Sequence, residues 1–335
     1  MRERPMKPEL VISRLEQDAP LWLASSWDHS GIQVKGARDA ITRVAVALDP
    51  TLATINKALA ADADFILTHH PLGLTPRFPT KDDTLYAVMA SLMSQGVWLY
   101  AAHTSLDAQP EGPANWLAQE LGMINQDILE PTARQTALLI RIPHGQNLQT
   151  TDLSGVVTII NQETMLELVV WKDAWPHIRQ ALEAQCADRF DYHAIALEEP
   201  SRVYGFGCIG DLEQPVDWPS LQNRLAHVLG TRHWTRIGTR PDVITRVAYC
   251  PGSGASLAPR AFGAGAHVYI TGDMKYHQAQ DIESLGLTLD VGHHVLEERM
   301  MAVWHKRIQQ DFKAQGVEVV FIPGTDPLHQ EMIAT

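Results

Sequence analysis

Short apolar runs alternate with amphipathic stretches in the first third of the chain. The run 42–48 is rich in β-branched residues, and Asp49-Pro50 and a helix-like stretch follow it. The runs 64–68 and 97–103 repeat this pattern, with a helix-like stretch at 83–95 between them. A short buried strand followed by an amphipathic helix, repeated along the chain, predicts a mainly parallel sheet with helices on both faces.

The same alternation returns near the C-terminus. Apolar runs lie at 245–250, 267–271 and 287–292, and a long helix-like stretch begins at His294. A final apolar run at 317–322 is typical of a last strand. We therefore expect an α/β core whose sheet is built from two separate parts of the sequence.

The middle of the chain has a different pattern. The apolar run 166–171, the helix-like stretch after it, and strand-like runs at 191–197 and 202–207 predict a smaller α+β layer. A length of 335 residues fits one large domain with an insertion, or two domains. We divide the chain into a first half of the core (1–128), an inserted α+β segment (129–210) and a second half of the core (211–335).

The composition excludes several classes of protein. Hydrophobic residues make up 45% and charged residues 20% of the chain, which is typical of a globular protein. The formal net charge is −12 and no cluster of Lys and Arg interrupts it, which disfavours direct binding to nucleic acid. No run approaches the roughly 18 consecutive apolar residues of a membrane span, so we expect no membrane association.

The cysteines and the N-terminal segment predict a cytoplasmic protein. Cys186, Cys208 and Cys250 lie far apart and cannot pair completely, and no CxxC spacing is present. This usage fits a reducing compartment. The first twenty residues contain prolines and an amphipathic pattern where a secretion signal needs an uninterrupted apolar core.

The first candidate for site chemistry is Thr68-His69-His70-Pro71, which follows directly on a predicted buried strand. Open α/β sheets bind ligands at the carboxyl ends of their strands. Taken alone, the two imidazoles are explained as well by hydrogen-bonded or solvated loop histidines.

Two further segments place metal-ligating residue types at strand ends. His103-Thr104-Ser105-Leu106-Asp107 follows the run 97–103, although an aspartate in a loop is commonly a turn former or a helix cap. His293 and Glu297 follow the run 287–292 at the start of the long helix. Their spacing of four puts both side chains on one helix face, close enough to share a metal, or to form a simple surface pair.

Three strand ends thus bring imidazole and carboxylate groups to one edge of the predicted sheet. These are ligands that zinc, iron and manganese accept. Five ligands exceed what one tetrahedral zinc needs, whereas two metals about 3.5–4 Å apart are commonly bridged by a carboxylate. We therefore expect two divalent metal ions per chain, held by His69, His70, Asp107, His293 and Glu297.

Other polar residues are expected around the same edge. Asp49, Asp273 and Lys275 are candidates for substrate binding, and His277 and His103 for proton transfer. Asp273 as a helix cap and His277 as an exposed helix residue are the simpler alternatives. The turn Gly252-Ser253-Gly254 joins a strand to a helix and is able to cradle an anion at the helix N-terminus.

Several of these segments resemble, in the same order, the motifs of a dinuclear metal-binding family. The family is known as the GTP cyclohydrolase I type two homologues, or the NGG-interacting-factor-three-like family. The resemblance covers roughly residues 7–125 and 240–325. It rests on Trp27-Asp28-His29-Ser30-Gly31-Ile32-Gln33-Val34, Thr68-His69-His70-Pro71, His103-Thr104-Ser105-Leu106-Asp107, Gly252-Ser253-Gly254, Tyr269-Ile270-Thr271-Gly272-Asp273-Met274-Lys275-Tyr276-His277 and Gly292-His293.

The resemblance implies the same five metal ligands and a toroidal homohexamer whose metal sites face an internal cavity. The chain departs from the family pattern in two places. His29 stands where the family usually has asparagine after Trp-Asp. Longer members carry an inserted domain similar to the PII signalling proteins, and residues 166–197 resemble only part of it.

The main functional hypothesis is a metal-dependent hydrolase that acts on a small, nucleotide-like substrate. A metal pair lowers the pKa of a bridging water and polarises the bond to be attacked. The family name points to the purine ring of GTP. The alternative is a protein that stores or delivers iron or zinc without turnover. A scaffold with structural metals is disfavoured because such sites have no open coordination position, and direct action on DNA is disfavoured by the negative charge.

Overall fold

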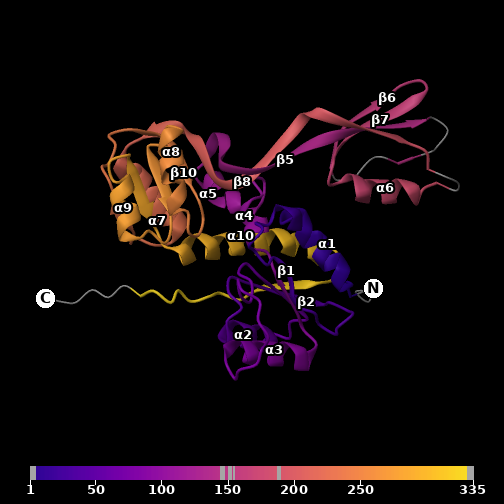
Figure 1. Ribbon diagram of the computed structural model, residues 1–335, viewed down its shortest axis with the longest axis horizontal. Coiled ribbons are helices and arrows are strands. Elements are labelled where there is room, and N and C mark those ends of the chain that lie inside the picture. Colours follow the sequence, from indigo (N-terminus) through magenta and orange to yellow (C-terminus); the bar gives the residue numbers. More distant parts are fainter. Residues whose placement is uncertain (1–4, 144–147, 150–152, 154, 187–189, 330–335) are drawn as a thin grey trace. The chain divides into compact units, whose positions relative to one another are not determined.

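The computed structural model describes residues 5–143, 148–149, 153, 155–186 and 190–329 (Figure 1). The chain divides into two compact units. The core unit consists of residues 1–130 and 205–335, and the inserted unit consists of residues 131–204. The expected division into residues 1–128, 129–210 and 211–335 stays a prediction.

Five strands form the first sheet of the core unit. Their order is β1 (Gly31–Val34), β4 (Trp98–Ala101), β3 (Phe65–Thr68), β2 (Arg43–Ala47) and β13 (Glu318–Phe321). The last four are parallel, and β1 pairs antiparallel with β4 at the edge. Because Thr68 and Ala101 are paired at the carboxyl ends of β3 and β4, the residues after these two strands meet at one edge of the sheet.

Helices cover both faces of this sheet. They are α2 (Leu52–Ala60) and α3 (Thr84–Gln95) on one face, and α1 (Pro8–Asp18) and α10 (His293–Lys313) on the other. The side chains of β2 alternate accordingly: Val44 and Val46 pack with α1 and α10, while Ala45 and Ala47 pack with α2 and α3. A sheet covered on both faces explains why its strands are continuous apolar runs.

The second sheet of the core unit has a parallel centre and antiparallel flanks. Its strands, in order, are the first part of β5 (Met123–Pro143), β8 (His193–Val216), β10 (Ile244–Tyr249), β11 (Val268–Thr271), β12 (Leu287–Asp290) and β9 (Thr235–Ile237). β10, β11 and β12 are parallel, whereas β8 and β9 run antiparallel to their neighbours. The carboxyl end of β12 leads through Gly292 directly into α10.

The second sheet is also covered on both faces. α8 (Ala258–Gly263) and α9 (Tyr276–Ile282) pack on one face, and α7 (Trp218–Leu229) and α10 pack on the other. The remaining short helices of the unit are η1 (Leu21–Leu23), α4 (Thr104–Asp107), η2 (Pro113–Asn115), α5 (Trp116–Glu120) and η3 (Ala255–Leu257).

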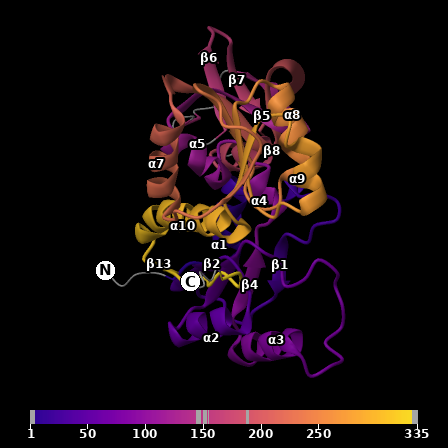
Figure 2. The same ribbon diagram turned by 90° about the vertical axis from the view of Figure 1, so that its left-hand side faces the viewer.

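Helix α10 lies between the two sheets of the core unit (Figure 2). Met300, Trp304, Ile308 and Phe312 are fully buried along it and belong to one apolar cluster with strands of both sheets. Burying one such side chain contributes about 1.5–3 kcal/mol to stability. Since α10 begins with His293, its packing also places the first turn of the helix between the strand ends of both sheets.

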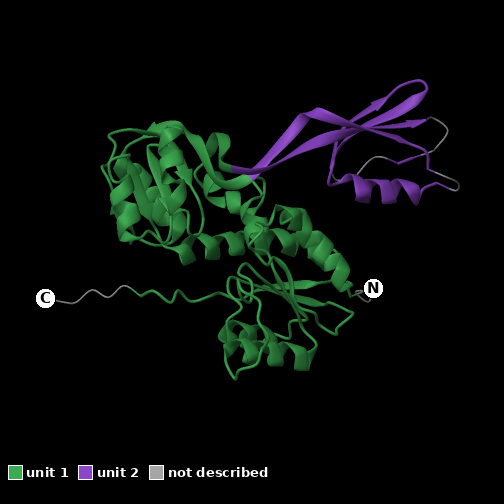
Figure 3. Cartoon of the chain, in the orientation of Figure 1, with its two compact units in different colours: residues 1–130, 205–335 green, residues 131–204 purple. Residues whose placement is uncertain are grey.

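The inserted unit is a smaller α+β layer (Figure 3). It contains β6 (Val156–Asn161), β7 (Met165–Trp171), α6 (Trp175–Glu183) and parts of β8 and of β5 (Met123–Pro143), in the strand order β6-β7-β5-β8. Its core packs the strand residues Ile140 and Leu168 against Trp175, Ile178 and Leu182 of α6.

Each apolar run expected to be a core strand forms one, and the mixed α/β class is confirmed. The expected parallel strands form the centre of each sheet. The expectation of one sheet is corrected, because the core has two sheets and antiparallel strands flank the parallel ones. The runs 191–197 and 202–207 are parts of the single strand β8. No helix within the described part of the chain has the length and apolar character needed to cross a membrane.

Candidate metal centre

His69 and His70 emerge from the carboxyl end of β3, as the sequence predicts. His69 is fully buried, and its Nδ1 lies 2.8 Å from the carbonyl oxygen of Ala102. Since a carbonyl only accepts, Nδ1 carries the proton, which leaves a lone pair on Nε2. His69 Nε2 is buried and has no hydrogen-bond partner. A metal ion would satisfy such an atom, and a backbone carbonyl behind the other nitrogen is the usual support of a metal-binding histidine.

His70 is oriented in a similar way by a carboxylate. Its Nδ1 lies 2.7 Å from Oδ1 of Asp49, which follows β2. Its Nε2 lies 3.1 Å from Oε2 of Glu297 and 3.4 Å from Nε2 of His293. Asp49 therefore holds the His70 ring so that Nε2 faces the first turn of α10.

Glu297 is the central side chain of the cluster. It is 3% exposed. Its Oε2 lies 2.7 Å from His293 Nε2 and its Oε1 lies 3.6 Å from His69 Nε2. Asp107 of α4 completes this side, with a buried, unpartnered Oδ1 3.7 Å from His69 Nε2. One carboxylate thus faces three imidazoles.

His293 is supported by a residue with unusual backbone geometry. Its Nδ1 lies 2.6 Å from Oδ2 of Asp273, in the loop after β11. Asp273 has a φ of 58°, which is uncommon for a residue with a side chain. Such backbone conformations persist at sites where the surrounding structure holds them. The structure therefore places Asp273 behind a candidate ligand.

The charges of the cluster are mutually dependent. Burial lowers the pKa of His70, but Asp49 and Glu297 outweigh it and raise the pKa to about 10. For His293, burial is likewise outweighed by Glu297 and Asp273, and the pKa is raised to about 9. For Glu297, burial favours the neutral form, but the imidazoles hold its pKa well below the usual range. Burial raises the pKa of Asp107.

His103 joins the cluster from the end of β4. Its Nδ1 lies 2.8 Å from Oδ1 of Asp28, and its ring packs edge-on against His69 and His70. Oδ2 of Asp28 accepts hydrogen bonds from the backbone and hydroxyl of Thr104. Asp28 thus anchors both His103 and the first turn of α4.

The donor set fits metal ions. Within the described part of the chain, His69, His70 and His103 form one group of converging ligand atoms, and His70, His293 and Glu297 form another. Ligand atoms around one tetrahedral zinc lie about 3.3 Å apart, as bond lengths of 2.0–2.1 Å require. The contacts among these side chains are in this range, and they include buried atoms with no partner.

Comparison with known proteins identifies the family. A model of the Duf34/NIF3 (NGG1p interacting factor 3) family matches residues 6–327. The chain belongs to this family. Among its NIF3 relatives, the GTP cyclohydrolase 1 type 2 homolog of Halalkalibacterium halodurans is 25% identical over 362 aligned positions, covering 95% of this chain and 97% of the relative. NIF3-like protein 1 of Bos taurus is 27% identical over 322 positions, covering 88% of this chain and 84% of the relative.

Solved structures of NIF3 relatives share the fold. A Bacillus cereus protein related to NIF3 aligns with a TM-score of 0.80 at 24% identity, covering 99% of this chain and 100% of that one. A Staphylococcus aureus protein aligns with a TM-score of 0.72 at 22% identity, covering 98% of this chain and 99% of that one. At these identities the likeness establishes the fold alone. The family resemblance expected from the motifs is confirmed.

The structure brings all five expected NIF3-family ligands together. Asp49, Asp273 and His103 contact them, whereas His277 does not join the cluster. His277 is exposed on α9, where its Nδ1 lies 3.1 Å from Oε1 of Gln280, and it belongs to neither group of converging ligands. Lys275 and Asp273 line a cavity of about 440 Å³ with Ser253, Met274 and Gln278. The expected roles of Asp49, Asp273 and Lys275 in substrate binding, and of His277 and His103 in proton transfer, stay predictions.

Two parts of the site were not expected from the sequence. Asp28 anchors His103. The sequence feature that could have pointed to this role is the Trp-Asp motif, which the chain shares with the family. Gly252, in the turn after β10, lies against Glu297, and a Cβ there would overlap the carboxylate. Anion binding by this turn stays a prediction, and its glycine makes room for a candidate ligand.

Proposed function

We propose that this protein is a dinuclear metal-dependent hydrolase that acts on a small, nucleotide-like substrate. The observation that supports it most directly is the Glu297 carboxylate, which faces His69 on one side and His70 and His293 on the other. A carboxylate shared between two ligand sets is characteristic of two-metal sites.

The side chains divide into two sets. His69, Asp107 and Oε1 of Glu297 would hold one zinc, iron or manganese ion, and His70, His293 and Oε2 of Glu297 would hold the other. When bound, such a pair lowers the pKa of a water and polarises the bond that the water attacks. Asp49 and Asp273 orient His70 and His293 from behind.

His103 is the proposed proton carrier. Asp28 lies behind its Nδ1, so that Nε2 is free to accept a proton from an attacking water and return it to a leaving group. The edge-on contact of its ring with His69 and His70 places it beside the cluster. A side chain held by a buried carboxylate keeps one orientation during the reaction. His277 remains a second candidate for this role.

The surroundings of the centre favour an anionic substrate. Lys275 and Ser253 line one cavity together with Asp273. A second cavity of about 390 Å³ is lined by His29, Ser30 and Arg77, and the Arg77 guanidinium also pairs with Asp83. Ser30 accepts a hydrogen bond from the backbone of His103. The name of the relative in Halalkalibacterium halodurans directs the search to GTP. We also propose a homohexamer, which sedimentation would reveal.

The test combines metal analysis with turnover. Elemental analysis of untagged protein, before and after reconstitution, is expected to give about two metals per chain, and fewer in the double variant His69→Ala, Glu297→Ala. His277→Ala serves as the histidine control and is expected to retain the metals. Multiple turnovers of GTP or another nucleotide, abolished by Glu297→Gln in a folded protein, would support the hydrolase. Two exchangeable metals without turnover would support storage or delivery, and no metal after reconstitution would refute both.

A further inference from the structure

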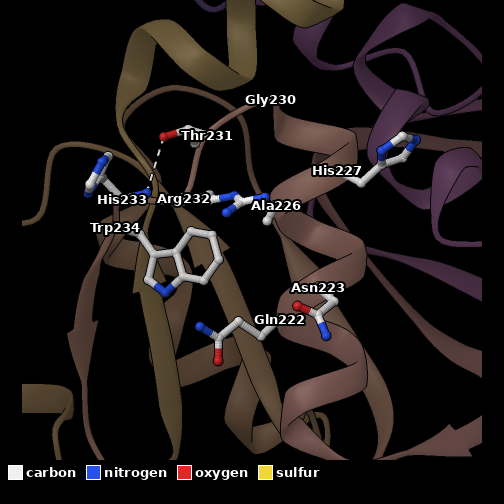
Figure 4. Close-up of a pocket in the computed structure, with 9 residues that line it drawn as sticks. All are labelled: Gln222, Asn223, Ala226, His227, Gly230, Thr231, Arg232, His233 and Trp234. Carbon is white, nitrogen blue, oxygen red and sulfur yellow. Dashed lines mark hydrogen bonds between the residues drawn. The ribbon is translucent and has the colours of Figure 1, made fainter.

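A separate cavity of about 910 Å³ lies between α7 and the loop that leads into β9 (Figure 4). None of the candidate metal ligands lines it. Its lining residues are Gln222, Asn223, Ala226, His227, Gly230, Thr231, Arg232, His233 and Trp234. The cavity volume is in the range of sites that bind small organic molecules.

The charge of this lining differs from that of the whole chain. The nine lining residues include an arginine and two histidines but no aspartate or glutamate, whereas the chain has a formal net charge of −12. Within the described residues, the guanidinium of Arg232 and the carboxamide of Gln222 make no hydrogen bond or ion pair. An arginine without a carboxylate partner, in an otherwise acidic protein, is available to an anion from solution.

The polar groups converge in space. Figure 4 shows the guanidinium of Arg232, the indole of Trp234 and the carboxamide of Gln222 directed into the same space. The Thr231 hydroxyl accepts a hydrogen bond of 3.2 Å from the backbone of His233, which holds the loop in its bent form. Trp234 packs one side against the apolar core, and this fixes the position of its ring.

A second guanidinium lies at the rim. Gly230 ends α7 with a φ of 69° and turns the chain into the loop. Arg299 of α10 lies against it, because a Cβ on Gly230 would be 2.8 Å from Arg299 Nη2. The C-terminal end of α7 carries a partial negative charge that disfavours an anion. Binding of an anion here therefore depends on the two arginines.

We propose that this cavity binds a nucleoside phosphate, at a site distinct from the metal centre. The indole of Trp234 provides a surface for the flat base, since base–aromatic stacking is favourable and tolerates every base. The Gln222 carboxamide both donates and accepts, and so matches the edge of a base. The Arg232 guanidinium, with Arg299 at the rim, holds the phosphate through charge-assisted hydrogen bonds.

The test is calorimetric titration of the full-length protein with AMP and GMP in excess chelator, so that metals do not contribute. Both nucleotides are expected to bind. Arg232→Gln is expected to weaken binding about tenfold or more, as loss of a charge-assisted hydrogen bond implies. Lys57→Gln removes one positive charge from the exposed face of α2 and serves as the matched control, with unchanged affinity.

Further titrations separate the parts of the proposal. Inorganic phosphate and adenosine are each expected to bind more weakly than AMP. The variant Gln222→Ala, on the exposed face of α7, is expected to lower the affinity for AMP but not the affinity for phosphate. The Glu297→Gln protein is expected to bind AMP normally, which distinguishes this site from the metal centre. No AMP binding, equal affinity in Arg232→Gln, or phosphate binding as tight as AMP binding would overturn the proposal.

Discussion

Gly252 lies against the carboxylate of Glu297. A Cβ on Gly252 would overlap Oε1 of Glu297, and it would lie 3.3 Å from the Glu297 Cδ and 3.6 Å from Cε1 of His293. Gly252 also has a φ of 63°, which side chains disfavour. The turn after β10 and the first turn of α10 are therefore fitted to each other at a glycine, and the position of the candidate bridging carboxylate depends on it.

The variant Gly252→Ala is expected to displace Glu297 and to lower the metal content of the protein. The stability cost should be about 1–2 kcal/mol, as a side chain in the left-handed region requires. Elemental analysis and urea unfolding measure the two effects. Gly263→Ala is the control, because no heavy atom lies within 4 Å of a Cβ there and its φ is ordinary. Full metal content in Gly252→Ala would contradict the expectation.

The variant Asp28→Asn is expected to release His103 and the first turn of α4. Asp28 accepts hydrogen bonds from Thr104 and Ser30 in addition to its contact with His103, and its side chain is fully buried. Loss of a buried charged acceptor should cost about 2–4 kcal/mol of unfolding free energy. Urea unfolding measures this, and the exposed Asp82→Asn should change little. An unchanged unfolding midpoint in Asp28→Asn would contradict the proposed anchoring role.

Asp64 is expected to make stability depend on pH in the acid range. Burial alone would raise its pKa, but hydrogen bonds from Thr42 and Arg38 outweigh burial and lower it. A lowered folded pKa stabilises the protein above the unfolded value of about 3.9, and this contribution is lost as the pH falls through the folded pKa. Asp64→Asn should therefore be about 1–3 kcal/mol less stable at neutral pH, with the difference shrinking in acid. A stability difference between Asp64→Asn and the unchanged protein that stays the same at every pH would argue against this role of the Asp64 carboxylate.

Metal binding is expected to release protons. In the metal-free cluster the pKa of His70 is raised to about 10 and that of His293 to about 9, so both imidazoles are protonated at neutral pH. Metal ions must displace these protons, so about two protons per chain should appear in a weakly buffered zinc titration at pH 7. The apparent affinity should rise with pH up to about 9–10. Protein already loaded with zinc provides the baseline, and metal uptake without proton release would contradict the protonation described here.

Much of the core could be predicted from local pattern, and the long strands could not. Val44 and Val46 alternate with alanines in a short apolar run, and burial on both faces of a sheet produces that pattern directly. β5 and β8 contain Pro131, Pro200 and several charged residues. Their conformation depends on pairing with neighbouring strands, and intrinsic β propensity is too weak to reveal it.

The sequence by itself determined the residue types of the candidate centre and their local placement: histidines and a carboxylate directly after strands, and His293 with Glu297 four apart on a helix. These features follow from periodicity and strand polarity, which act over a few residues. Only the tertiary structure decided the partners that orient them. Asp28 lies 75 residues from His103, and Asp49 lies 21 residues from His70. Such contacts form when separate strands and helices pack into one core, and no local pattern records them.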